Sequence, residues 1–87
     1  MSEEHIRERQ QQACALLQNA VGAPGREIHI CNPGDVLGKT CRTIVHGVLV
    51  YFRIASIHVE GSGDTMIITL CGGYDDTQYL TESTILW

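Results

Sequence analysis

VLVYFRIASIHVE, from Val48 to Glu60, is the longest strand-like run in the chain. Successive side chains of a strand point to opposite faces, so alternate residues share a face. The apolar side chains that share a face in the first half are Val50, Phe52 and Ile54. Those of the second half, Ile57 and Val59, have the opposite parity. We therefore predict a β-bulge or a sharp bend near Ala55-Ser56.

Other strand-like runs lie on both sides of this stretch. Alternation predicts strands over about 26–30, 40–46, 65–71 and 78–87. Glycine-rich turns separate them at Gly47, Gly61–Asp64 and Gly72–Asp76. Between the first two runs, Asn32-Pro33-Gly34-Asp35 is typical of a type II turn.

The first 22 residues have helical periodicity instead. Ser2 is a suitable N-cap, and Gly22-Ala23-Pro24-Gly25 is a stop signal. One apolar stripe recurs at helical spacing, comprising Ile6, Ala13, Leu17, Ala20 and Val21.

The sequence thus predicts one α+β domain over residues 1–87, with a helix at about 2–22 and a sheet at about 26–87. We expect the helix to pack on a strongly bent antiparallel sheet of about five strands, with closure into a small barrel as an alternative. Sm-like barrels share this order of elements and form rings through their edge strands. Their glycine and asparagine signature is absent here, so only the architecture is compared.

Gly38-Lys39-Thr40 matches the end of a phosphate-binding loop. The first glycine of that motif would stand at position 33, where the chain has Pro33, which lacks an N–H to donate. The residues after Thr40 favour a strand rather than the helix that such a loop requires. A nucleotide site of this kind is therefore excluded.

Composition narrows the class of function. Charged residues make up 18% of the chain and hydrophobic ones 44%, which is typical of a globular domain. The net charge of −4 disfavours nucleic acid as the main ligand. The amino terminus has no secretory pattern, and the apolar run from Val48 to Phe52 is too short to span a bilayer. We expect a cytoplasmic protein without a membrane association, whose four cysteines are free thiols.

Metal or catalytic chemistry has weak support. His29, Cys31, Cys41 and His46 are residue types that zinc prefers, but they include no Cys-x-x-Cys pair, and whether they meet is left open. Cys71 precedes two glycines, yet nothing in the sequence selects a histidine as its base. We therefore predict no enzyme, no cofactor and no metal site.

Two surfaces are candidates for protein contacts. An acidic tyrosine loop, formed by Tyr74, Asp75, Asp76 and Tyr79, is suited to docking on a basic surface. The apolar strand end Ile85, Leu86 and Trp87 predicts self-association through that edge.

Two functional hypotheses follow. The first is a small acidic, non-enzymatic protein-binding module, an inhibitor or adaptor of a nucleic-acid-handling protein of the kind that phages or mobile elements encode. The alternative is a homo-oligomeric small barrel that binds a nucleotide-like ligand or RNA. It would use Lys39, Arg42 and Arg53 for phosphates and Tyr51 for base stacking.

Overall fold

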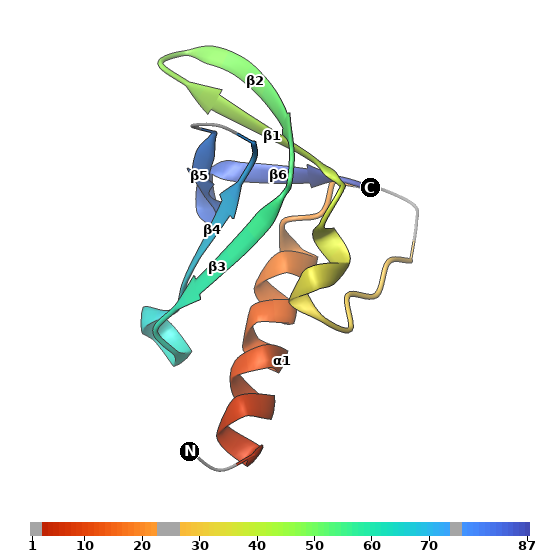
Figure 1. Ribbon diagram of the computed structural model, residues 1–87, viewed down its shortest axis with the longest axis vertical. Coiled ribbons are helices and arrows are strands. Elements are labelled where there is room, and N and C mark those ends of the chain that lie inside the picture. The colour runs from red at the N-terminus through yellow and green to blue at the C-terminus, as the bar shows by residue number, and fades with distance from the viewer. Residues whose placement is uncertain (1–2, 23–26, 74–75) are drawn as a thin grey trace.

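The computed structural model describes residues 3–22, 27–73 and 76–87 (Figure 1). Within these ranges the chain is α+β, with an amino-terminal helix as predicted. The helices are α1 (Glu3–Asn19) and the short 3-10 helices η1 (Pro33–Val36), η2 (Gly63–Thr65) and η3 (Leu80–Glu82). The strands are β1 (Thr40–Val45), β2 (Val48–Arg53), β3 (Ser56–Glu60), β4 (Ile67–Cys71), β5 (Thr77–Tyr79) and β6 (Ser83–Leu86).

The strands form two antiparallel sheets of three strands each. Sheet A has the order β2-β1-β6, and sheet B has the order β3-β4-β5. The prediction of a single sheet of about five strands is therefore wrong, and so is its closure into a barrel. The predicted run over 78–87 is divided by η3 between the two sheets.

The two sheets separate where the sequence predicts a bend. The backbone of Ile54 still bonds to the β1 side, donating to the Lys39 carbonyl and accepting from the Gly38 N–H. The N–H of Ala55 donates instead to the Cys71 carbonyl of sheet B, at 2.7 Å. Because adjacent residues bond to different sheets, the continuous run from Val48 to Glu60 becomes two strands.

β1 and β2 form a hairpin with a two-residue turn. Val45 pairs with Val48, so only His46 and Gly47 lie between the strands. Both have positive φ, 51° and 77°, as a type I′ turn requires. The turn fixes the register of the two strands and therefore which side chains face the core.

The core lies between α1 and the two sheets. The helix contributes Ala13, Cys14 and Leu17, and the sheets contribute Cys41, Phe52, Ile54, Ile68, Leu70 and Ile85. Arg9 also fixes α1 to the end of β3 and the residue that follows it, because its guanidinium donates to the carbonyls of Val59 and Gly61. The amino-terminal end of the helix projects beyond the sheets (Figure 1), and Ile6 there is 47% exposed.

The helix ends three residues before the predicted boundary. After Asn19 the chain turns and runs beside β6, where the Ala20 carbonyl accepts from the Ile85 N–H. The Gly22 N–H donates to the Ile85 carbonyl at 2.9 Å. This segment forms a parallel bridge to β6 and so covers part of that edge of sheet A.

The strand predicted at about 26–30 is wrong for the described residues 27–30, which pair with no strand. The side-chain amide of Gln18 takes the place of a neighbouring strand. It donates to the Ile28 carbonyl and accepts from the Ile30 N–H. The alternation nevertheless predicts correctly which side chains are buried, since Ile30 is buried while Glu27 and His29 are exposed.

The type II turn predicted at Asn32–Asp35 is also wrong, because Pro33 begins η1 and Gly34 is not among the residues with positive φ. The carboxylate of Asp35 stabilises this 3-10 turn. It accepts hydrogen bonds from the backbone N–H groups of Cys31 and Asn32.

We expect Gln18→Met to lower the free energy of unfolding by about 1–3 kcal/mol, because it leaves the backbone groups of Ile28 and Ile30 without partners. The matched control is Gln11→Met, at an exposed position on the same helix, with an expected change within about 0.5 kcal/mol. Urea unfolding followed by circular dichroism measures both. Equal effects of the two substitutions would contradict a structural role for the Gln18 amide.

Candidate interaction site

One face of sheet A points away from the core and carries exposed arginine, tyrosine and aliphatic side chains. Alternation directs Cys41, Thr43, Phe52 and Ile85 inward, where all four are buried. The residues of opposite parity form what we call the sheet A outer face: Thr40, Arg42, Ile44, Leu49, Tyr51, Arg53, Thr84 and Leu86.

The register places an aromatic residue next to two arginines on this face. Tyr51 lies directly opposite Arg42 on the neighbouring strand, and Arg53 is two residues farther along β2. The phenol is 54% exposed and both arginines are exposed. Directly opposite residues on one face of an antiparallel pair lie within contact distance. The three side chains therefore form one cluster.

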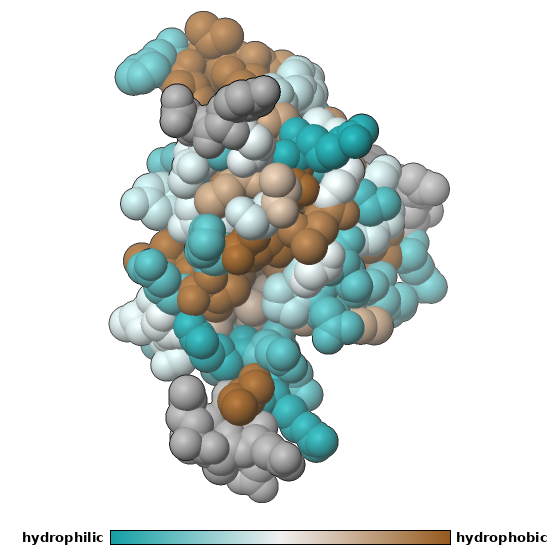
Figure 2. Space-filling model, viewed as in Figure 1, coloured by the Kyte–Doolittle hydropathy of each residue, from teal (hydrophilic) through white to brown (hydrophobic). Residues whose placement is uncertain are grey.

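Aliphatic side chains extend the cluster to the tip of the hairpin. Ile44 and Leu49 are paired across the strands and are 64% and 52% exposed. Figure 2 shows hydrophobic atoms gathered at the top of the view, where Figure 1 places the end of the β1–β2 hairpin. Neither residue was predicted to belong to a site, although the parity that places Phe52 in the core also places Leu49 on the outer face.

The charges of this face are unbalanced. No acidic residue belongs to it, and neither Arg42 nor Arg53 forms a hydrogen bond or ion pair with another residue in the described ranges. Lys39, which was predicted to act with them, has the opposite parity. Its ammonium lies 4.4 Å from the centroid of the Trp87 ring in a cation–π contact. Three of the four residues predicted for phosphate and base binding are thus together, and one is apart.

The predicted acidic tyrosine loop is described only in part, because Tyr74 and Asp75 lie outside the described residues. Asp76 lines a hollow of about 240 Å³ together with Gln78 and Phe52. Tyr79 lines a different hollow. The two described members of the predicted loop therefore face different parts of the surface.

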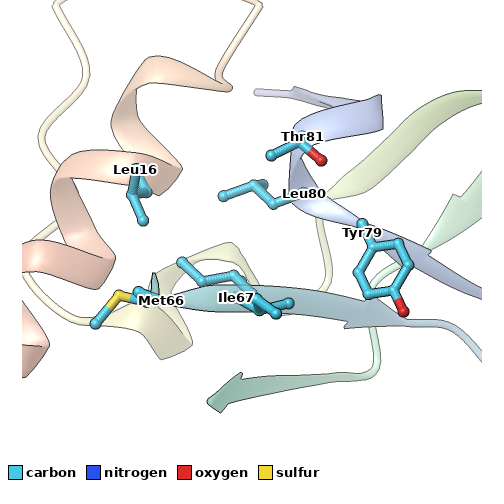
Figure 3. A pocket seen from close by; sticks show the side chains of 7 residues that line it. Leu16, Met66, Ile67, Tyr79, Leu80 and Thr81 are labelled. Atoms are coloured by element: carbon cyan, nitrogen blue, oxygen red, sulfur yellow. The ribbon is translucent and has the colours of Figure 1, made fainter. Parts of the chain in front are cut away.

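The hollow beside Tyr79 is an apolar groove of about 320 Å³ between α1, β4 and η3. Figure 3 shows Leu16 and Leu80 pointing toward each other across it, with Met66 and Ile67 along one wall. The Tyr79 ring lies at the far end with its hydroxyl directed away. The groove thus offers aliphatic contacts and few polar partners.

The residues predicted for self-association have dissimilar environments. Ile85 is fully buried, while Leu86 and Trp87 are half-buried. The outward N–H and C=O of Ile85 are bonded to the chain's own Ala20 and Gly22. The backbone of β6 at Ile85 is therefore not open to a second chain, and self-association through residues 85–87 stays a prediction.

The residues considered for metal binding or catalysis are dispersed. No group of three or more His, Cys, Asp or Glu side chains within the described ranges is placed to hold a metal ion. Cys41 is buried at the start of β1, whereas His46 is exposed in the turn beyond its end. The Cys71 thiol accepts a hydrogen bond from the Thr77 hydroxyl, at 3.9 Å, and from no described histidine.

Comparisons with known proteins do not place the chain in a family. No protein-family model, no curated protein and no solved structure matches it. As for membranes, none of the helices in the described ranges has the length and apolar character needed to cross a bilayer.

All four cysteines are free thiols, in different environments. Cys31 is exposed, and Cys41 is fully buried. Burial raises the pKa of the Cys41 thiol, because the thiolate is poorly solvated in the core. At pH 8 we expect a water-soluble disulfide reagent to modify Cys31 at least about tenfold faster than Cys41, as measured by mass spectrometry of peptides. Equal rates would contradict the burial of Cys41.

The raised pKa of the Cys41 thiol also makes the free energy of unfolding depend on pH. The folded state holds the thiol proton more tightly than the unfolded state does, so this contribution is present below the ordinary thiol pKa of about 8.5 and is lost as the pH rises above it. We expect the native protein to lose more stability than Cys41→Ala between pH 8 and pH 10. Parallel pH profiles in urea unfolding would contradict this linkage.

Proposed function

We propose that the chain is a non-enzymatic protein-binding module, an adaptor or inhibitor, and that its partner docks on the sheet A outer face. The observation that carries the proposal is the cluster of Tyr51, Arg42 and Arg53 beside the exposed Ile44 and Leu49. Tyrosine and arginine are over-represented among the residues that dominate binding energies at protein interfaces.

Charge complementarity indicates what kind of partner surface would bind to this face. The domain carries a net charge of −4, yet this face holds two arginines that form no ion pair with a described residue, and no acidic side chain belongs to it. A partner surface with exposed aliphatic groups flanked by aspartate or glutamate would satisfy both arginines and cover the apolar side chains. A basic partner is disfavoured at this face, because like charges would be brought together.

The face is also rigid enough for recognition. β1 is paired on both sides, by β2 and β6, and its inward residues Cys41 and Thr43 are buried. Arg42, Ile44 and Tyr51 therefore project from a backbone that is ordered before binding. A preordered surface loses less conformational entropy on association than a flexible loop does.

A second candidate function uses the same cluster. Two arginines beside an exposed tyrosine could hold phosphates and stack a base of single-stranded RNA. Ile44 and Leu49 support the protein partner more than RNA, because they add apolar area without polar groups for bases or phosphates.

The test reverses one charge at the centre of the face. Tagged native protein, Arg42→Glu and the control Arg7→Glu, which makes the same charge change at an exposed helix position, are used to capture proteins from a lysate of the source cells. We expect a partner that is retained by Arg7→Glu and whose affinity, measured with the purified partner, falls at least about tenfold with Arg42→Glu.

Two outcomes would contradict the proposal. Equal affinities of Arg42→Glu and Arg7→Glu for every captured protein would exclude the sheet A outer face as the docking surface. A labelled single-stranded RNA of about 12 nucleotides that binds the native protein, but not Arg42→Glu or Tyr51→Ala, would favour the second candidate.

A further inference from the structure

β2 is an open edge of sheet A. It pairs only with β1, and beyond it no described strand continues the sheet. In an antiparallel pair, residues alternate between those that bond to the neighbour and those that face away. The two-residue turn makes Val45 and Val48 a bonded pair, so the backbone groups of Leu49, Tyr51 and Arg53 face outward.

These outward groups have no hydrogen-bond partner in the described part of the chain. The opposite edge of the same sheet differs, because the Ile85 backbone is bonded to Ala20 and Gly22. Figure 1 shows β2 as an outer rim of the molecule. Among the described residues, sheet A thus has one edge that the chain partly covers and one that pairs with no further strand.

β2 also lacks the features that usually prevent edge pairing. Open edges are protected by proline, lysine, bulges or short strands. The sequence of β2, VLVYFR, contains neither proline nor lysine, and its single charged residue stands at the last position. Its register with β1 is regular over six residues, without a bulge. An unprotected edge with exposed apolar side chains is a site for strand addition.

We propose that β2 pairs antiparallel with β2 of a second copy, about a two-fold axis beside Tyr51. The strand is complementary to itself in this register. Tyr51 lies opposite Tyr51 of the second copy, and Arg53 lies opposite Leu49, so no like charges are paired. The outward groups of Leu49, Tyr51 and Arg53 would all be hydrogen-bonded, and two sheets A would join into one.

The pairing leaves the sheet A outer face exposed and makes it larger. Across the two-fold axis, a row would run from Arg42 through Tyr51 to the same two residues of the second copy. Each aromatic ring would then have an arginine on one side and a ring on the other. The dimer is independent of the proposed function, since it requires no other protein, and it is closed because each copy uses the same edge.

Cysteine cross-linking tests the register with purified protein. In a Cys31→Ser background, Tyr51→Cys places two thiols on a directly opposed pair, whose Cα atoms lie about 5.5 Å apart, within the range for a disulfide. Leu49→Cys is the matched control on the same face and edge, with similar exposure. Its two copies would be four residues out of register, about 13 Å apart along the strand.

We expect Tyr51→Cys to form a disulfide-linked dimer under mild oxidation, and both Leu49→Cys and the background protein to stay predominantly uncross-linked. Cross-linking of Leu49→Cys as efficient as that of Tyr51→Cys would overturn the register. Failure of Tyr51→Cys to cross-link while it remains folded by circular dichroism would overturn the pairing.

Hydrogen exchange of the unmodified protein provides a test without substitutions. On raising the concentration, the amides of Leu49, Tyr51 and Arg53 should exchange at least about tenfold more slowly, while the amide of Ser62 should not change. A monomer in native mass spectra and in sedimentation at all concentrations would overturn the proposal, and so would a ring of more than two copies.

Discussion

The change of hydrogen-bonding partner between Ile54 and Ala55 is the constraint on which the rest of the structure depends. Ile54 completes sheet A, and Ala55 begins sheet B through the Cys71 carbonyl. Two hydrophobic faces can then converge on α1 although they come from one continuous run of residues. Because of the same change, Ile57 and Val59 pack against the core, although they have the same parity in the sequence as the exposed Tyr51 and Arg53. A straight strand would have placed one of these pairs in the wrong environment.

The candidate site is a consequence of this geometry. Because Cys41, Thr43 and Phe52 are the residues of β1 and β2 that are buried, the outward residues of these strands are free to vary in chemistry without cost to the core. The burial of Cys41, Thr43 and Phe52 directs their neighbours Arg42 and Tyr51 to the outer face. The two-residue turn sets the register that places Arg42 opposite Tyr51. The position of the site is thus set by the hairpin, and its chemistry by side chains that the core does not use.

Sequence periodicity predicted much of this arrangement but not the partners of each strand. The parity change at Ala55-Ser56 predicted the bend, since it depends only on local alternation. It could not show that the chain divides into two sheets, because that depends on whether the strand alongside is β1 or β4. At 27–30 the alternation correctly separated buried from exposed side chains. It could not distinguish a strand from a segment held by the Gln18 amide, which satisfies the same backbone groups.

The candidate site was predictable to a similar degree. Parity alone groups Tyr51 with Arg53, and the β1–β2 turn then brings in Arg42. Parity also places Lys39 and Arg42 on opposite faces, although the two residues are close in the sequence. The state of the two sheet edges depends on long-range contacts, namely the bridge from Ala20 and Gly22 to Ile85. No local sequence pattern near Ile85 predicts that bridge.

That bridge also joins two segments that lie far apart in the sequence. The Ala20 carbonyl and the Gly22 N–H acquire their backbone partner only when Ile85, which is far along the chain, is in place. During synthesis, the helix therefore leaves the ribosome long before the strand that anchors its end. Contacts of such high sequence separation slow folding, because the connecting chain must lose entropy before they form. β2 also leaves the ribosome before β6, so a nascent chain exposes the apolar side chains of this strand while sheet A is still incomplete.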